Sequence, residues 1–484
     1  MNGTIDAVRG MRDVLPTEYT AQATVAARLE RALMLAGYQQ VDLPILERRD
    51  LYLRKLGEEL VGKVYEFSFN GRELALRPEW TASVLRAYVG RLQEQPLPLR
   101  LRYAGPVFRN ERPQRATYRQ FTQIGVELIG GPAPRADAEC ITLACSALDA
   151  AGVADYRVRI GHIGLIRAVL GSMGLAERTQ GVLAWSLERM RDRGIAAVRE
   201  QLEQEDEPGD FDIRLLEGLS DQQAEALLLH SLGAIGVKLQ FGTRPPEAIV
   251  RRLVRKLRRP DQRPLVERAL VVLERLARIV GPPAEALPQV AALLGEYDLP
   301  TSGLDELRAI LDLVIASGVP EKRLLADFGL GRGLHYYTGT IFEVYADDIQ
   351  LCGGGRYDDL VTTLGGRQAT PAVGFAYGLE RVALAVNTPA PNVQPVEVLV
   401  VPTEDAAFPY AQRVAARLRE RGYVATVDVR GRNVAANARD AARRGTAFLA
   451  LVTLEQGERH ELTWRDLQSR DERVVGLADV PMIL

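Results

Sequence analysis

The stretch that most constrains the fold of this chain runs from Arg102 to Gly130, RYAGPVFRNERPQRATYRQFTQIGVELIG. Its two ends predict half-buried strands, which the polar sequence NERPQRAT joins. This loop and the residue just before it carry one glutamate, Glu111, among the arginines Arg109, Arg112 and Arg115. A guanidinium matches the oxygen geometry of phosphate, and a carboxylate accepts hydrogen bonds from an exocyclic amine. We therefore expect the loop to hold an anionic ligand.

The second strand of this pair places Gln123 and Glu127 on one face, because side chains alternate between the two faces of a strand. Gly125 lies between them at the same parity, and we expect it to open space for a ligand. An amide and a carboxylate beside such a space suit a ligand with an amino group and a polar ring nitrogen.

The composition narrows the class of protein. At 484 residues the chain is too long for one compact domain, and we expect two or three. No uninterrupted apolar run is long enough to span a membrane, and the first residues do not resemble a signal peptide, so we expect a cytoplasmic protein. Three cysteines without metal-ligand spacing predict small buried side chains and no metal site. With a net charge of −2, any RNA contact must come from local patches.

A second candidate segment follows a predicted hairpin. Asn70-Gly71 is a strong signal for a hairpin turn, and the strand after it ends in the sequence RPEWTA. Glu79 in this sequence has two interpretations. It either binds a ligand or stabilises the N-terminus of a helix predicted from Thr81, where an acidic residue is favourable.

Two later segments add arginines. The sequence DFGLGRGLHYYTGTIFEVY, which begins at Asp327, places Arg332 between glycines that permit tight backbone turns. The sequence VGFAYGLERVALA places Arg381 on an apolar helix. Because a charge in an apolar face needs a partner, we expect Arg381 to contact a ligand.

The remaining regions predict helices and a separate α/β domain. From about residue 177 to 317 the pattern is almost entirely helical, with a basic run from Arg251 to Arg259 that is either an RNA-binding face or a solvated helix face. His162, at the end of the preceding strand, is expected to hydrogen-bond the backbone. After the linker NTPAPNVQP, a βαβαβ order predicts a largely parallel sheet. Its candidates for RNA contact are Arg430, Arg432, Arg439, Arg443 and Arg444.

These segments together resemble the histidyl-tRNA synthetase family, which belongs to the class II aminoacyl-tRNA synthetases. FRNERPQ with YRQFTQIGVE is similar to the second signature motif, GLER to the third, and RGLHYYTG to the histidine-specific motif. The resemblance implies an α/β (α+β) fold with an antiparallel sheet flanked by helices. It implies a discontinuous catalytic core over 1–164 and 318–388, a helical insertion over 165–317, and a three-layer α/β anticodon-binding-like domain over 396–484.

The resemblance also implies ligands and roles. The ligands are histidine, ATP with Mg²⁺ as a substrate complex, and tRNA, and a proline-containing first motif around Pro44 implies a homodimer. The implied catalytic residues are Arg109, which grips the α-phosphate, and Arg332, which stabilises the charge passing to the adenylate. The residues expected at ATP are Arg109, Glu111, Arg381 and, from its place in the loop, Arg115. Those expected at histidine are Glu79, Thr81, Tyr336 and Tyr337, with Gln123 and Glu127 from the strand pattern.

Three positions depart from the family pattern. Trp80 replaces a glycine, and we expect its indole to narrow the pocket or form one wall. Thr117 replaces an arginine that contacts the γ-phosphate, part of whose work Arg381 could cover. His335 replaces an aspartate.

These departures and the sequence GHIGL resemble a paralogue, the regulatory subunit of ATP phosphoribosyltransferase in histidine biosynthesis. The chain is therefore either a histidine–tRNA ligase or a non-catalytic histidine-binding protein that partners a phosphoribosyltransferase catalytic subunit. Three features favour the ligase: the sequence GLER, which resembles the third signature motif, the pairing of Arg109 with Glu111, and the C-terminal domain.

Overall fold

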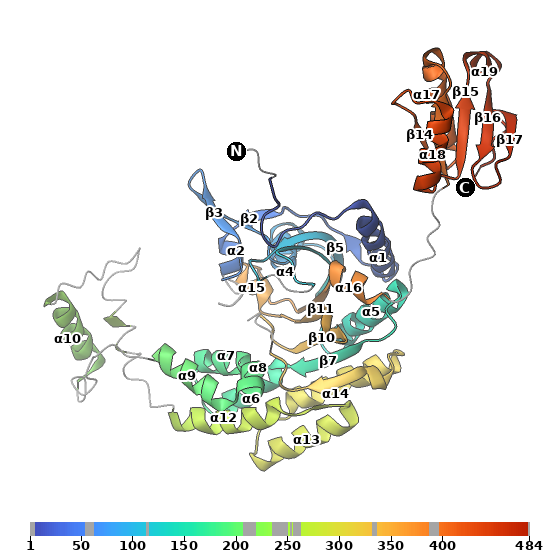
Figure 1. The fold of residues 1–484 in the computed structure, drawn as a ribbon. Helices are drawn as coiled ribbons and strands as arrows, with labels where there is room; N and C mark the ends of the chain where they lie inside the picture. Colours follow the sequence, from blue (N-terminus) through green and yellow to red (C-terminus); the bar gives the residue numbers. More distant parts are fainter. Residues whose placement is uncertain are drawn as a thin grey trace. The chain divides into compact units, whose positions relative to one another are not determined.

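The computed structural model describes residues 5–53, 62–112, 116–206, 219–234, 250–251, 254, 263–331, 336–386 and 396–482. The predicted site residues Arg115 and Arg332 lie outside these ranges, as do His335, the whole linker and most of the basic run. The chain divides into two compact units, Met1–Thr388 and Pro389–Leu484 (Figure 1). The finer boundaries expected for the helical insertion, 165–317, stay a prediction.

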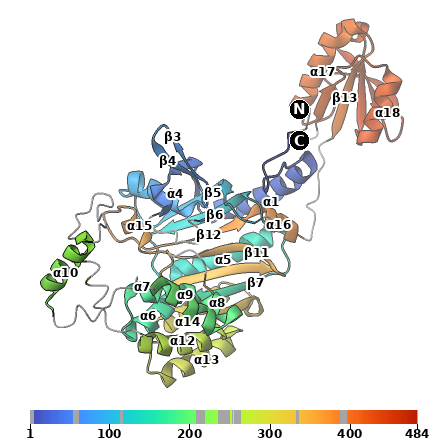
Figure 2. The ribbon, with the colours of Figure 1, turned by 60° about the vertical axis from the view of Figure 1, so that its left-hand side comes forward.

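A nine-stranded sheet forms the centre of the first unit (Figure 2). Neighbouring strands run antiparallel, except that β1 is parallel to β5 and β7 is parallel to β9. The predicted strand pair is confirmed, because β5 and β6 pair along their whole length. The strand order is β1 (Gln39–Gln40), β5 (Leu99–Phe108), β6 (Gln120–Ile129), β12 (Ala372–Gly378), β11 (Ile349–Arg356), β10 (Thr340–Ala346), β7 (Arg157–His162), β9 (Leu324–Asp327) and β8 (Val280–Gly281).

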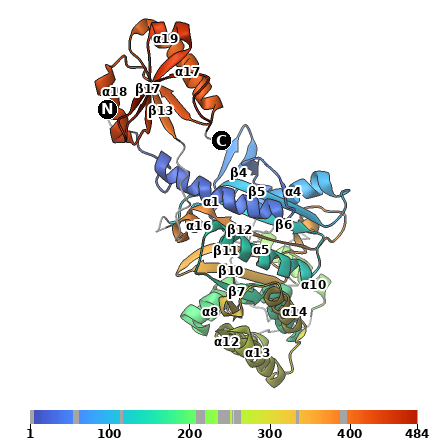
Figure 3. The ribbon, with the colours of Figure 1, turned by 90° about the vertical axis from the view of Figure 1, so that its right-hand side faces the viewer.

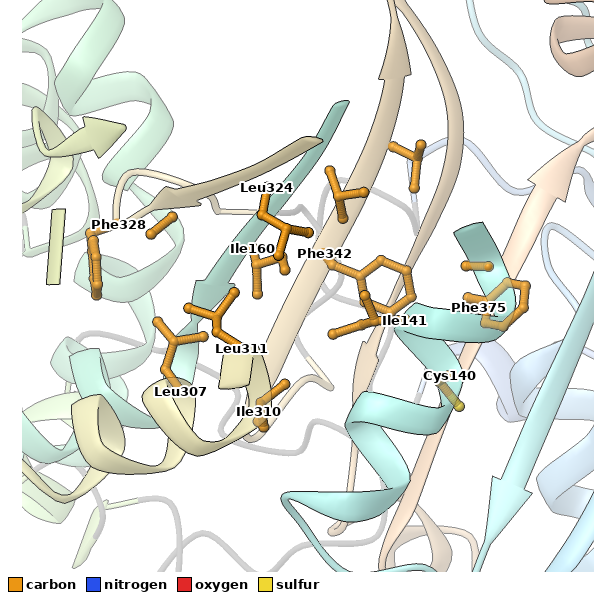
Figure 4. Close-up of a cluster of buried hydrophobic side chains, with 14 of the residues drawn as sticks. Cys140, Ile141, Ile160, Leu307, Ile310, Leu311, Leu324, Phe328, Phe342 and Phe375 are labelled. Carbon is orange, nitrogen blue, oxygen red and sulfur yellow. The ribbon is translucent and has the colours of Figure 1, made fainter. Parts of the chain in front are cut away.

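Helices cover one face of this sheet and thereby fix which side chains face the other. The covering helices include α1 (Pro16–Leu35), α5 (Arg135–Ala151) and α14 (Ser302–Ala316). Figure 4 shows apolar side chains of α5 and α14 directed toward Ile160, Phe342 and Phe375 of the sheet. Ile124 and Val126 of β6 belong to the same core. Because side chains alternate, the polar residues between and beside them face the opposite side of the sheet.

A smaller three-stranded sheet has the order β2 (Leu46–Arg48), β4 (Arg72–Leu76) and β3 (Glu66–Phe69). Asn70 and Gly71 have φ angles of 50° and 71°, which confirms the predicted hairpin turn. Ahead of Pro44, Gln39–Gln40 pairs with the large sheet, at its edge. Proline has no N–H to donate to a ladder, which agrees with pairing that stops before Pro44.

A group of helices packs near β7, toward the end of the large sheet formed by β7, β9 and β8, in all three views (Figures 1, 2 and 3). It begins at His162, whose Nδ1 accepts the Leu165 N–H at 2.9 Å and whose Nε2 lies 3.1 Å from Glu306 Oε1, so the expected backbone role is confirmed. Among the described helices, none combines the length and apolarity that a membrane span requires. The described α-helices between His162 and β9 are α6 (Ile163–Ser172), α7 (Glu177–Trp185), α8 (Leu187–Arg193), α9 (Ile195–Asp206), α10 (Asp221–Ala234), α12 (Arg263–Ala277), α13 (Pro283–Glu296) and α14.

The second unit confirms the predicted three-layer α/β domain. β13 (Glu397–Pro402) pairs in parallel with β14 (Val424–Val427) and β15 (Phe448–Val452), and β16 (Glu461–Asp466) and β17 (Glu472–Gly476) extend the sheet antiparallel. Alternate residues of β13 belong to two cores: one contains side chains of α17 (Phe408–Glu420), the other side chains of α18 (Val434–Arg444). A short helix, α19 (Leu454–Arg459), precedes β16.

Candidate active site

A cavity of about 380 Å³ brings together most of the site residues predicted from distant segments. It lies where β6, β10, β11 and β12 meet the N-terminal end of α4 (Thr81–Ala87) and the N-terminal end of α16 (Leu379–Ala385). Glu127 lies behind this lining and contacts it through hydrogen bonds. The predicted residues that line the cavity are Glu79, Thr81, Arg109, Glu111, Gln123, Tyr336, Tyr337 and Arg381.

Glu127 is a completely buried carboxyl at one end of the cavity. Its Oε1 accepts a hydrogen bond from the Thr81 hydroxyl at 2.7 Å and another from the Tyr103 hydroxyl at 3.0 Å. Both donors line the cavity, so Glu127 determines how they are oriented. Burial raises the pKa of Glu127 well above its ordinary value, and these two hydrogen bonds oppose the rise.

Of the two roles that the sequence left open for Glu79, the structure shows the helix role and places the residue at the cavity, where the ligand role stays a prediction. Its Oε1 accepts the Ala82 N–H at 2.9 Å, which stabilises the first turn of α4, and the residue also lines the cavity. Burial raises the pKa of Glu79, while the positive charge of Arg109 acts in the opposite direction. A cationic group in the cavity would therefore stabilise the ionised forms of Glu79 and Glu127 together.

Four buried polar atoms around the cavity have no hydrogen-bond partner within the described ranges. They are Glu79 Oε2, Gln123 Oε1, Glu127 Oε2 and the Tyr357 hydroxyl. A buried polar atom without a partner is costly, and native proteins leave few of them. Two carboxyl oxygens and an amide oxygen accept hydrogen bonds, so they match a ligand that brings several N–H donors.

Two glycines show how closely this end of the cavity is packed. A Cβ at Gly374 would overlap Glu127 Oε2 and lie 2.6 Å from the Tyr357 hydroxyl, so this position has no room for a side chain. The expectation that Gly125 opens space for a ligand is wrong. A Cβ there would overlap the Phe375 carbonyl oxygen and lie 2.6 Å from the Tyr103 hydroxyl. Gly125 stands opposite Tyr103 in the β5–β6 register and makes room for that tyrosine.

Trp80 neither narrows nor lines the cavity, contrary to the prediction. Its indole is fully buried and stacks on the Tyr103 ring, with ring centroids 4.9 Å apart and planes 10° from parallel. The Arg77 guanidinium lies 3.5 Å from the indole centroid and donates to the carbonyl oxygens of Leu43 and Pro106, each at 2.8 Å. Trp80 therefore supports Tyr103 from behind the pocket wall.

The other end of the cavity carries cationic side chains that are positioned by neutral oxygens. Arg109 Nε donates to the Pro78 carbonyl at 2.9 Å. Arg381 donates to the carbonyls of Ala116 and Gln350 at 3.0 and 3.3 Å, and its Nη2 lies 3.3 Å from the Thr117 hydroxyl. Because the acceptors of Arg381 are neutral, they orient its guanidinium without neutralising it, which favours an anion beside it.

Three acidic residues at this end already have protein partners, two through hydrogen bonds and one through an ion pair. Glu343 accepts the Tyr345 hydroxyl at 2.6 Å and the Gln350 side-chain amide at 2.8 Å, and both carboxyl oxygens of Glu380 accept the Thr122 N–H. Lys63 Nζ lies 3.6 Å from Glu111 Oε1. A Mg²⁺ ion bound mainly through substrate phosphates and water fits such a site better than one held by a dedicated set of protein ligands.

Sequence reasoning missed several lining residues. Tyr103 and Gly374 could have been found only with the strand pairing in hand. Tyr103 stands opposite Gly125 on the neighbouring strand, and Gly374 stands opposite Glu127. Tyr357 follows the sequence CGGGR, and nothing in that sequence indicates that the tyrosine lines a cavity. Glu188 of α8 also lines the cavity, although it comes from the helical region.

Comparisons with known proteins agree with this geometry. A family model described as histidyl-tRNA synthetase matches residues 10–234 and 244–382, and one described as an anticodon binding domain matches residues 397–484. Curated relatives named histidine–tRNA ligase include one from Archaeoglobus fulgidus, 32% identical over 99% of both chains. Another, from Methanosphaerula palustris, is 33% identical over 94% of this chain and 91% of its own.

Solved structures share the fold. A histidyl-tRNA synthetase from Nostoc matches with a TM-score of 0.65 and 21% identity, covering 98% of this chain and 97% of its own. A Bacillus halodurans protein titled as an ATP phosphoribosyltransferase regulatory subunit/histidyl-tRNA synthetase matches with the same TM-score and 22% identity, over 94% of this chain and 99% of its own. The family model and the curated relatives go beyond the fold, and they show that this chain belongs to the histidyl-tRNA synthetase family.

Proposed function

We propose that this chain is a histidine–tRNA ligase, which activates histidine with ATP to histidyl-adenylate and transfers the histidyl group to tRNA. One observation carries the proposal: buried acceptors that lack a partner among the described residues lie around a single cavity that two guanidinium groups also line. The acceptors suit an amino group and an imidazole, and the guanidinium groups suit phosphates. The curated relatives, similar over nearly their whole length, support the same activity.

Histidine would bind at the Glu127 end. Glu79 Oε2 would accept a hydrogen bond from the amino group of histidine. Glu127 Oε2 and Gln123 Oε1 would accept hydrogen bonds from its remaining N–H groups. Tyr336 and Tyr337 line the same space. The ammonium charge of the ligand lowers the raised pKa of both carboxyls, so binding and ionisation favour each other.

ATP would bind at the other end, with Arg109 at the α-phosphate, Arg381 at the γ-phosphate and Glu111 at the adenine amine. A histidine carboxylate oxygen then attacks the α-phosphorus, and pyrophosphate leaves. Mg²⁺, which the family generally uses, would arrive with ATP and neutralise phosphate charge. Arg332 would stabilise the charge that develops during transfer, and Arg115 would assist from its loop; both are assigned by resemblance alone.

Transfer requires tRNA, and we assign its recognition to the second unit. Of the arginines named for RNA contact, Arg432, Arg443 and Arg444 pair with Asp440 at 3.1, 3.1 and 2.8 Å. The shared contact with Asp440 thereby holds these three charges close together, at α18 and just before its first residue. We also propose a homodimer, since Leu46, Phe67 and Phe69 expose 44%, 43% and 62% of their surface on the small sheet.

The experiment that tests the proposal is histidine-dependent exchange of labelled pyrophosphate into ATP by the purified protein. We expect exchange with histidine and none without it, because exchange requires reversible adenylate formation. The non-catalytic alternative, a regulatory partner of ATP phosphoribosyltransferase, predicts histidine binding without exchange. Trp80, Thr117, His335 and the sequence GHIGL motivated that alternative, and calorimetric binding of histidine without exchange would favour it over the ligase.

A further inference from the structure

Helix α8 brings a carboxylate from the helical region into the cavity. Glu188 lines the cavity together with Tyr336 and Tyr337, although it precedes them by far in the sequence. Its Oε1 lies 3.3 Å from the backbone N–H of Gly331, which donates to it. Gly331 is the residue immediately before Arg332 in the chain.

The same helix holds the other end of this backbone segment. Arg191, about one turn after Glu188, donates from Nη1 to both oxygens of Asp327 at 3.1 and 3.2 Å. Asp327 is completely buried, and its Oδ1 also accepts the Gly329 N–H at 3.0 Å. A buried carboxylate is stable only with such partners, so the position of Arg191 determines the position of Asp327.

Close packing leaves this segment little freedom to move against α8. A Cβ at Gly329 would overlap the Ala277 carbonyl oxygen and lie 3.1 Å from Arg191 Nη1. A Cβ at Gly331 would lie 3.6 to 3.8 Å from atoms of Ala184, Leu187 and Glu188. The backbone from 327 to 331 therefore runs directly along the helix surface.

We propose that Glu188 is a positioning residue for histidine activation: with Arg191, it holds the backbone of residues 327–331 against α8, beside the cavity that Glu188 itself lines. The inference rests on the proposed function and adds that a helix outside the catalytic motifs sets the rate of adenylate formation in the absence of tRNA. Glu188 acts through its hydrogen bond to the Gly331 N–H and does not take part in proton transfer.

The test compares three substitutions of exposed or half-buried residues on α8 by pyrophosphate exchange. Glu188→Ala removes the acceptor, whereas Glu188→Gln keeps an oxygen that can accept the Gly331 N–H. Arg193→Gln is the matched control, because Arg193 is exposed on the same helix. We expect Glu188→Ala to lower kcat by roughly tenfold or more, with the KM for histidine changed little. Glu188→Gln and Arg193→Gln should stay within about twofold of the unsubstituted protein, a range typical of surface substitutions.

Each outcome decides between explanations. If the unsubstituted protein shows no exchange, the proposed function fails before the inference is reached. If it exchanges and Glu188→Ala exchanges equally well, the inference is wrong. Equal loss in Glu188→Ala and Glu188→Gln would also overturn it, because the carboxylate charge would then matter rather than the hydrogen bond. Should Glu188→Ala melt early, Glu188→Leu replaces it, since a leucine side chain cannot accept the N–H and adds no charge, and the same loss of kcat is expected.

Discussion

Replacing Trp80 by glycine, the residue that the family carries at this position, should weaken histidine binding. The indole is fully buried between the Arg77 guanidinium and the Tyr103 ring. Removing such a side chain leaves a cavity, and substitutions of buried tryptophan by a small residue cost about 3–5 kcal/mol of unfolding free energy. We expect a loss of about 4 kcal/mol in Trp80→Gly.

The effect on histidine follows from Tyr103. Without the stacked indole, Tyr103 is no longer held with its hydroxyl 3.0 Å from Glu127 Oε1. A hydrogen bond to a charged group contributes about 1.5–3 kcal/mol, so the Kd for histidine should rise roughly tenfold or more. Trp80→Phe keeps an aromatic face against Tyr103. It should therefore lose only part of the unfolding free energy and only part of the affinity for histidine.

Urea unfolding followed by circular dichroism measures the stability of Trp80→Gly, and titration calorimetry measures its histidine affinity. The reasoning is refuted if the variant binds histidine more tightly while its unfolding free energy is unchanged. That result would mean that the indole crowds the ligand after all.

Three further predictions test other parts of the cavity. Gly374→Ala should weaken histidine binding roughly tenfold or more, because its Cβ would displace Glu127 Oε2; Gly295→Ala on α13, which has open space around it, is the control, and equal calorimetric affinities in both would contradict the packing argument. Arg381→Ala should lower pyrophosphate exchange about a hundredfold with histidine affinity kept, and an unaffected rate would remove Arg381 from the phosphate site. Because burial raises the pKa of Glu127, the ligand-free folded protein binds its proton more tightly than the unfolded chain does. The unfolding free energy therefore falls as pH rises above about 4.3, and in Glu127→Gln this fall should be smaller in melting curves recorded across that range; parallel curves would contradict it.

The sequence predicted best those features that depend on neighbouring residues. Alternation along β5 and β6 defined both strands, and Asn70-Gly71 defined a hairpin, because backbone sterics act locally. Arg109 and Arg381 line one cavity, as expected from the resemblance of their two segments to the second and third signature motifs of the family. Arg332 and Arg115, which complete that prediction, lie outside the described residues.

The features that sequence reasoning misassigned depend on what lies across the fold. Gly125 was assigned to a ligand because one strand does not reveal that Tyr103 stands opposite it. Trp80 was assigned to the pocket because its neighbours Glu79 and Thr81 belong there, whereas its own side chain points toward Arg77. Glu188 could not be linked to Gly331 by any local pattern, since 143 residues separate them.

The most direct measurement of the central claim is the amount of histidyl-adenylate that forms on the protein without tRNA. Purified protein is mixed with histidine and α-labelled ATP, quenched with acid and separated, with Arg381→Ala and Arg193→Gln measured in parallel. We predict close to one adenylate per site in the unsubstituted protein and in Arg193→Gln, and far slower formation in Arg381→Ala. A protein that binds histidine but forms no adenylate would contradict the claim that amino acid and nucleotide share this cavity.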